Sequence, residues 1–189
     1  DQGQYGAEEM EKFKGYLATM RREVERTTAI VQNLLDFTRP KEPDRRTMDL
    51  VEVIEESLAL ISNKLSLANI EVVKLLNPLP DIQADPAHMK QVFLNLFINA
   101  SEAMEEGGTL TIRSDHHPDT NTVTMSVLDT GIGIEPADQE RLFERFHRVV
   151  GARSRSHEGT GIGLALVAEL AELHGGSVAL ESAPGEGSS

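Results

Sequence analysis

Cysteine is absent from the 189-residue sequence, which excludes disulfide bonds, thiolate metal sites and a cysteine nucleophile. Long apolar runs are absent as well, since none reaches the ~18 consecutive apolar residues that a membrane-spanning helix requires. No signal-peptide pattern opens the chain. The hydrophobic fraction of 39% still supports an ordinary core, and the length suits one compact domain with an appendage. We therefore expect a cytoplasmic protein.

Positive charge is scarce, with 18 Lys and Arg residues against 31 Asp and Glu residues and a net charge of −13. We expect no nucleic-acid partner, because a phosphate backbone requires a positive protein face. Five arginines nevertheless fall within one short stretch: Arg141, Arg145, Arg148, Arg153 and Arg155. Two interpretations remain open for them. They form either a solvated helix face partly neutralised by Glu140 and Glu144, or a local anion site.

Histidine does not occur before position 88. The six histidines are His88, His116, His117, His147, His157 and His174. Their spacing matches no metal-binding motif. Histidine therefore predicts no metal site in this sequence.

Apolar residues in the first 40 positions alternate spacings of three and four. They are Met10, Phe13, Leu17, Met20, Val24, Thr27, Val31 and Leu34, with one polar member. This heptad pattern predicts one long helix from Ala7 to about Thr38. Such a helix cannot bury its stripe alone, so it requires a partner in a bundle or a dimer. Pro40 and Pro43 end it and begin a charged linker.

The remaining sequence predicts alternating helices and strands. In chain order we expect a helix at 50–68, a strand at 70–76, a short strand near Ile82, a helix at 88–104, strands at 109–114 and 122–128, a short helix at 136–146, a helix at 160–173 and a strand at 177–181. Asp49 with Glu52 forms a capping-box pattern, and Asp85-Pro86 is an N-cap followed by proline. This order predicts an α+β fold, a two-layer α/β sandwich with helices on one face of a mixed sheet, preceded by one long coiled-coil-like helix.

The expected helix at 88–104 has a core-facing stripe at helical spacing, formed by Met89, Val92, Phe93, Leu96, Ala100 and Ala103. Leu94 and Ile98 lie on its opposite side, so we expect this helix to be covered on more than one face. Two asparagines stand out in it. Asn95 and Asn99 are four residues apart, so both amides lie on one edge of the apolar stripe. A single asparagine could be a satisfied polar group of the core. Two in register favour a shared ligand, and amide oxygens suit a hard cation such as Mg²⁺, which also takes phosphate oxygens and waters.

Two glycine motifs follow. Asp129-Thr130-Gly131-Ile132-Gly133-Ile134 comes directly after an expected strand, where a carboxylate beside glycines suits an exocyclic amine on a planar ring. Its alternative interpretation is an Asx-type turn. Gly159-Thr160-Gly161-Ile162-Gly163-Leu164 opens a helix, whose N-terminal N–H groups suit an anion. The alternative is a mobile loop that ends in glycines, and the spacing fits neither a P-loop nor a Rossmann motif.

Together these motifs resemble the catalytic ATP-binding domain of bacterial two-component sensor histidine kinases. That domain belongs to the GHKL group of ATP-binding folds, shared with DNA gyrase, a heat-shock chaperone and a mismatch-repair ATPase. The asparagine helix resembles the N box of this family, which implies that Asn99 is a Mg²⁺ ligand and Asn95 a supporting contact. Asp129 resembles the aspartate that accepts a hydrogen bond from the adenine amino group. The resemblance extends from Asp85 to Glu181.

Two further motifs support the resemblance. Leu142 to Phe146 resembles the phenylalanine box, and Arg148 the arginine that approaches the phosphates. The second glycine motif resembles the box that ends the ATP lid, so we expect a mobile lid at 147–159. The implied ATP-binding residues are Asn95, Asn99, Asp129, Gly131, Gly133, Ile134, Arg148, Gly159, Thr160, Gly161, Gly163 and Leu164, and the implied metal ligands are Asn99 and Asn95.

The N-terminal helix, which ends at Asn33 to Pro40, resembles the second helix of the family's dimerisation and phosphoacceptor hairpin. No histidine precedes His88. We therefore expect the first hairpin helix, which carries the family's phosphoacceptor histidine, to be missing from this sequence. Ala183 to Ser189 resembles the approach to a final strand. We therefore expect a partial dimerisation helix at 1–39, a linker at 40–48 and an ATP-binding domain at 49–189 without its final strand.

The resemblance implies donation of the ATP γ-phosphoryl to a histidine outside this sequence, for relay to a response-regulator aspartate. The implied partners are ATP with Mg²⁺, the phosphoacceptor hairpin, a receiver domain and a second copy bound through the N-terminal helix. The implied location is cytoplasmic, including the cytoplasmic part of a membrane-anchored sensor. Asn95 disfavours a related ATPase, whose glutamate at this position activates water, since an amide cannot act as a general base. That ATPase and a nucleotide-sensing or dimerisation module without transfer activity remain the alternatives.

Overall fold

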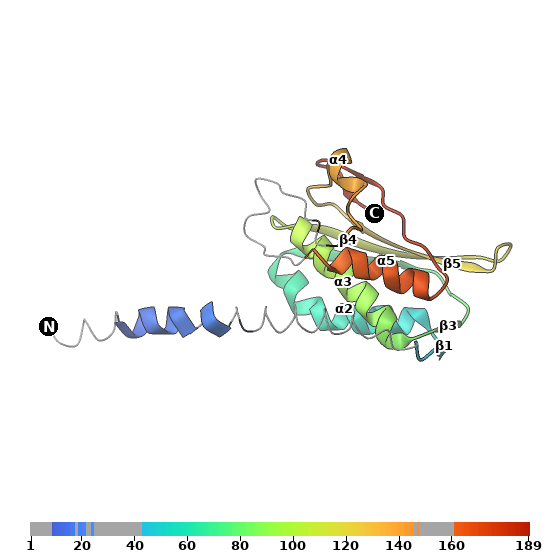
Figure 1. Cartoon of the computed structure of the whole chain (residues 1–189), viewed down its shortest axis with the longest axis horizontal. Helices are drawn as coiled ribbons and strands as arrows, with labels where there is room; N and C mark the ends of the chain where they lie inside the picture. The colour runs from blue at the N-terminus through green and yellow to red at the C-terminus, as the bar shows by residue number, and fades with distance from the viewer. Residues whose placement is uncertain (1–8, 18, 22–23, 25–42, 146, 148–160) are drawn as a thin grey trace. The chain divides into compact units, whose positions relative to one another are not determined.

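The computed structural model describes residues 9–17, 19–21, 24, 43–145, 147 and 161–189 (Figure 1). The chain divides into two units, Asp1–Lys41 and Glu42–Ser189. In the first unit every described residue is helical. The described members of the apolar stripe are 50–65% exposed, namely Met10, Phe13, Leu17, Met20 and Val24. The remainder of the helix expected at 7–38 lies outside the described residues.

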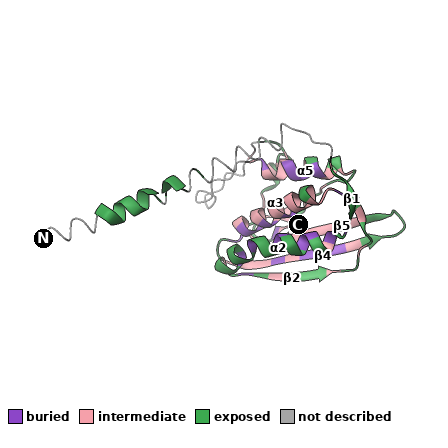
Figure 2. Ribbon diagram, turned by 90° about the horizontal axis from the view of Figure 1, so that it is seen from below, coloured by how far each residue is buried: buried purple, intermediate pink, exposed green. Residues whose placement is uncertain are grey.

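The second unit is a mixed sheet with helices on one side (Figure 2). Its elements are β1 (Arg46–Met48), α2 (Leu50–Leu67), β2 (Ile70–Leu76), β3 (Ile82–Ala84), α3 (Pro86–Ala103), β4 (Gly108–His117), β5 (Thr122–Asp129), α4 (Pro136–Gln139), α5 (Gly163–Leu173), β6 (Ser182–Ala183) and β7 (Gly187–Ser188). This arrangement confirms the predicted α+β class. Among the described residues, no helix has the length and apolar character needed to cross a membrane.

The main sheet has the strand order β2-β4-β5-β7-β6. β2 runs parallel to β4, with Ile70 opposite Gly108, whereas β4, β5, β7 and β6 pair antiparallel. β1 and β3 form a separate two-stranded sheet. Because β5 is bordered by β4 and β7, its end at Asp129 lies within the sheet and not at its edge.

The core lies between the sheet and the helices α2 and α3. Its fully buried side chains include Ile54 of α2, Phe97 of α3 and Ile112 of β4. α3 also contacts α5, so both of its flanks are covered. Half-buried Leu94 and Ile98 pack against this core, as expected for a helix covered on more than one face. Burial of such side chains stabilises the fold by about 1.5–3 kcal/mol each, which anchors α3 as the central helix.

Local sequence signals begin helices α2 and α3 as expected. The Asp49 side chain accepts a hydrogen bond from Val51 N–H at the start of α2. The Asp85 side chain accepts from Ala87 and His88 N–H groups ahead of Pro86. These capping bonds satisfy backbone donors that a helix N-terminus leaves unpaired. Both caps are therefore encoded locally.

The C-terminal strand prediction is wrong. Residues 177–181 are in no strand, and β6 begins at Ser182, although Glu181 already exchanges two backbone hydrogen bonds with Ser189, at 2.9 and 2.7 Å. Val178 and Leu180 are half-buried between exposed neighbours, which is the alternation typical of a strand. A strand also needs a hydrogen-bonded neighbour, and sequence alternation does not supply one.

Other bounds also differ from the sequence predictions. The helix expected at 136–146 ends at Gln139, and turns with i→i−3 hydrogen bonds follow it, such as Leu142 N–H to Gln139 O at 3.3 Å. α5 begins at Gly163, whereas position 160 was expected. β1 lies within the expected linker at 40–48. The sequence did not predict this strand, because its partner β3 is remote in the sequence. Phe97, absent from the predicted core stripe of α3, is among its most buried residues.

Candidate functional site

The two asparagines of α3 face the first turn of α5. A Cβ built at Gly163 would lie 3.3 Å from Asn95 Oδ1 and 3.9 Å from Asn99 Nδ2. A side chain at position 163 would therefore crowd the Asn95 amide and contact that of Asn99. The structure thus brings together three residues that sequence reasoning assigned to one site.

The Asn99 side chain has an unmet hydrogen-bonding requirement. Its Nδ2 atom is buried, and no hydrogen-bond partner is found for it among the described residues. An unsatisfied buried donor costs about 1–3 kcal/mol, so a phosphate oxygen or a water at this position would stabilise it. The same side chain carries an amide oxygen, a ligand type that Mg²⁺ accepts. Asn99 therefore fits a phosphate and Mg²⁺ site.

The N-terminus of α5 supplies backbone donors to the same place. Its N-cap residue, Ile162, makes no side-chain capping hydrogen bond, and no acidic residue lies in its first turn. Gly161, with φ +67°, leads into Ile162 and Gly163. The N–H groups of a helix N-terminus favour an anion, both by hydrogen bonding and through the helix dipole. Leu164 belongs to this turn.

No group of three or more His, Asp or Glu side chains suited to a metal ion is found in the described part of the chain. Mg²⁺ usually keeps several waters and shares phosphate oxygens, so it takes few protein ligands. The amides of Asn95 and Asn99 would supply the protein ligands.

Asp129 ends β5 and begins the first glycine loop. Its Oδ1 atom accepts a hydrogen bond from Gly131 N–H at 2.8 Å, so the Asx-type turn is formed. Burial raises the pKa of Asp129 above the ordinary value of 3.8, although the N–H groups of Gly131 and Ser188 oppose this effect. The carboxylate is thus partly withdrawn from water. Since it can accept about four hydrogen bonds, it retains capacity for a ligand N–H donor.

The first glycine loop lies against the end of α3, one turn beyond Asn99. Ile132 N–H donates to Ala103 O at 3.1 Å, and a Cβ at Gly131 would lie 2.6 Å from the same oxygen. Gly133 has φ +65°, and a Cβ there would collide with Ala183 O. Glycine is therefore required at both positions for the loop to approach its neighbours.

Ile134 is held through its main chain. Its N–H donates to Ser182 Oγ at 2.9 Å, and its carbonyl accepts from Gln139 Nε2 at 2.8 Å. Sequence reasoning selected Ile134 but missed Ser182 and Gln139. No periodicity or motif in the sequence indicated either one.

Part of the arginine-rich stretch is described. Arg141 Nε donates to Glu144 Oε2 at 3.0 Å, and Arg145 lies 3.7 Å from Glu169 Oε2. Both pairs are exposed, so they fit the solvated-face interpretation. Arg148, Gly159 and Thr160, most of the expected lid at 147–159, and the remaining arginines lie outside the described residues.

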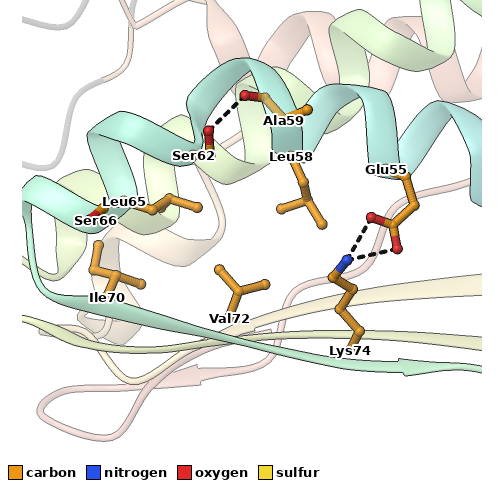
Figure 3. Close-up of a pocket in the computed structure, with 9 residues that line it drawn as sticks. All are labelled: Glu55, Leu58, Ala59, Ser62, Leu65, Ser66, Ile70, Val72 and Lys74. Atoms are coloured by element: carbon orange, nitrogen blue, oxygen red, sulfur yellow. Dashed lines mark hydrogen bonds and ion pairs between the residues drawn. The ribbon is translucent and has the colours of Figure 1, made fainter.

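A separate open groove of about 410 Å³ lies between α2 and β2 (Figure 3). Leu58, Leu65, Ile70 and Val72 line its apolar part, and the Glu55–Lys74 ion pair lies at one end. None of the residues predicted for the nucleotide site lines it. The groove therefore does not belong to the candidate site.

Comparison with known proteins identifies the family to which this domain belongs. Residues 84–189, more than half of the chain, match the family described as "Histidine kinase-, DNA gyrase B-, and HSP90-like ATPase". The chain belongs to this ATPase family. The match begins just before α3 and includes all of the predicted site residues.

The relatives of this chain within the family include proteins named as sensor histidine kinases. The chain is 37% identical over 169 residues to "Sensor histidine kinase ZraS" of Klebsiella oxytoca, a match that covers 89% of this chain and 35% of that protein. The chain therefore spans about a third of that relative. A crystal structure of full-length ShkA in complex with AMPPNP is similar, with a TM-score of 0.77, 27% identity and coverage of 93% of this chain and 37% of ShkA.

A second similar structure is histidine kinase ThkA in complex with the response regulator protein TrrA. It matches with a TM-score of 0.72 and 26% identity, over 92% of this chain and 48% of the other. These two structural matches cover 93% and 92% of this chain, so the similarity to histidine kinases extends beyond residues 84–189.

Proposed function

We propose that this chain is the ATP-binding catalytic module of a sensor histidine kinase. In this role it donates the ATP γ-phosphoryl to a histidine of a phosphoacceptor hairpin, for relay to a response-regulator aspartate. The single observation that carries the proposal is the position of α3. Asn95 and Asn99 face the start of α5, and the Asp129 loop contacts Ala103 at the end of the same helix.

The loop end of α3 suits the adenine base. The Asp129 carboxylate accepts a hydrogen bond from the exocyclic amine. Gly131 and Gly133 let the loop pack against Ala103 and Ala183, which holds the backbone up to Ile134 in place beside the base. Partial burial excludes water from this contact and strengthens it. The fixed direction of the carboxylate selects a base with a donor at that position.

The other part of the proposed site, one to two helical turns earlier along α3, suits the phosphates. The N–H groups around Gly161, Gly163 and Leu164 bind phosphate oxygens, with Asn99 and Asn95 on the facing helix. By resemblance, Gly159, Thr160 and Arg148 complete this end. Mg²⁺, when bound, neutralises the phosphate charge.

Asn95 favours phosphoryl transfer over hydrolysis. Activation of water requires a base near neutral pH, and an amide does not titrate there. The chain then contributes positioning and charge stabilisation, and the histidine nitrogen forms the new bond to phosphorus as the bond to ADP breaks.

The proposed partners follow from the comparisons and the exposed helix. The TrrA complex of ThkA supports a response-regulator receiver domain as a partner. The exposed stripe of the N-terminal helix supports packing against the phosphoacceptor hairpin and a homodimer in the full-length protein. The proposed location is the cytoplasm, including the cytoplasmic part of a membrane-anchored sensor.

Calorimetric titration with AMPPNP tests the proposal, with and without Mg²⁺. We expect the unchanged chain to bind, and to bind more tightly with Mg²⁺. Asp129→Asn should abolish binding in both conditions, whereas Asn99→Ala should remove most of the Mg²⁺-dependent gain. Absence of binding by the folded chain, or full affinity in the folded Asp129→Asn variant, would contradict the proposal.

A further inference from the structure

We propose that the C-terminal hairpin of β6 and β7, together with Gln139, positions the adenine-binding loop. Ser182 and Gln139 are then positioning residues that act through the Ile134 main chain on the Asp129 loop. This inference rests on the proposed function.

The Ser182 hydroxyl is at the centre of the arrangement. It accepts a hydrogen bond from Ile134 N–H at 2.9 Å and donates to Gly187 O at 2.8 Å. Ser188 Oγ lies 3.0 Å away as a further partner. One hydroxyl has one proton and two lone pairs, so these contacts use its full capacity. It therefore connects the loop to both strands of the hairpin.

Gln139 bridges the same two segments from the side of α4. Its Nε2 atom donates to Ile134 O at 2.8 Å and to Ser182 O at 2.9 Å. An amide has two N–H donors, and each meets one carbonyl. A glutamate of the same shape has no donor and would face both carbonyls with negative charge.

The hairpin also contacts the loop through its backbone. Gly185 N–H donates to Ile132 O at 2.7 Å. Ser188 pairs with Asp129 across the sheet, and a Cβ at Gly187 would collide with the Asp129 carbonyl. The hairpin therefore approaches both the loop and the residue proposed to recognise adenine.

Most of the backbone hydrogen bonds of the loop depend on this arrangement. Ile132 and Ile134 have four backbone N–H and C=O groups between them. Ala103 O takes one, and Gly185, Ser182 and Gln139 take the other three. Loss of a side-chain partner leaves a polar group unpaired and lets the loop change direction. The direction of the Asp129 carboxylate would change with it.

The test compares Ser182→Ala and Gln139→Glu with the unchanged chain. Ser182→Thr keeps the hydroxyl, and Ser177→Ala is a control at an exposed serine nearby. Melting curves identify variants that fail to fold. The measured quantities are the AMPPNP dissociation constant and its ratio with and without Mg²⁺, which reports on the phosphate end.

We expect Ser182→Ala and Gln139→Glu to weaken AMPPNP binding by about tenfold with an unchanged Mg²⁺ ratio, whereas Ser182→Thr and Ser177→Ala bind normally. In the empty protein, the Ile134 amide should exchange faster in Ser182→Ala than in the unchanged chain. The inference would be overturned if both folded variants bound AMPPNP within twofold of the normal affinity. It would also be overturned if the Mg²⁺ ratio fell by the same factor as the affinity. Failure of the unchanged chain to bind AMPPNP would refute the proposed function itself, so the two failures are distinguishable.

Discussion

The Ala103 carbonyl accepts a hydrogen bond from Ile132 N–H at 3.1 Å. This bond joins the last residue of α3 to the first glycine loop. Asn99 lies one helical turn earlier, so the phosphate end and the base end of the proposed site share one helix. A change at this junction should affect the fold and the base contact together.

Gly131→Ala tests the junction. Its Cβ would lie 2.6 Å from Ala103 O and 2.7 Å from Ala103 Cβ, so the loop must move away from α3. We expect a loss of about 1–3 kcal/mol in the free energy of unfolding, the usual cost of overpacking, with weaker AMPPNP binding. Urea denaturation measures the first effect and calorimetry the second. Gly176→Ala is the control, because its nearest atom is at 3.4 Å. Equal stability of the two variants would argue against this contact.

Protonation of Asp129 should be linked to nucleotide binding. Burial raises the pKa of Asp129 above 3.8 in the folded protein. Above this raised pKa the ionised carboxylate destabilises the empty fold, and the destabilisation is relieved as pH falls through the folded-state pKa. A bound amine favours the ionised form. We therefore expect the ¹³C signal of this carboxyl to titrate above pH 3.8 in the empty protein and at lower pH with saturating AMPPNP. The same midpoint in both states would show that the carboxylate does not contact the base.

Asp85 should contribute stability with the opposite pH dependence. Burial acts to raise the pKa of Asp85, but the N–H groups of Asp44 and Ala87 and the neighbouring His88 outweigh it, and the net pKa is lowered from 3.8. The stabilisation is therefore present above pH 3.8 and lost as pH falls through the lower folded value. Asp85→Ala should cost about 1–2 kcal/mol at neutral pH, and this difference should shrink on acidification. Asp85→Asn, which keeps an acceptor oxygen, should cost less. A pH-independent difference for Asp85→Ala would contradict the assignment.

Asn99→Ala should separate function from stability. The Nδ2 atom has no partner among the described residues, so its removal relieves a desolvated donor. We expect the empty variant to unfold within ~1 kcal/mol of the unchanged chain, in contrast to Phe97→Ala, for which a loss of about 3–5 kcal/mol is usual. Thermal and urea unfolding measure both variants. A large loss of stability in Asn99→Ala would indicate a structural asparagine.

The sequence predicted the parts of the site that depend on local signals. Asp85-Pro86 begins α3, and the four-residue spacing of Asn95 and Asn99 places them together once that helix forms. Local signals did not predict the side chains that bind the first glycine loop, Ser182 and Gln139. Ser182 is 48 residues from Ile134, and its role depends on strand pairing that no local pattern specifies. Phe97 was missed for a similar reason, because α3 is buried against α2, the sheet and α5, and a single amphipathic stripe does not describe such a helix.

Phosphoryl transfer from γ-labelled ATP tests the central claim most directly. The chain would be incubated with labelled ATP and Mg²⁺, alone and with a histidine-bearing hairpin from its own full-length parent. We expect acid-labile phosphohistidine on the hairpin and none on the chain itself. His174, for example, uses both ring nitrogens in hydrogen bonds to Leu170 O and Asp85 N–H. Stoichiometric label on a histidine of the chain, or release of labelled phosphate with an unlabelled hairpin, would contradict the account.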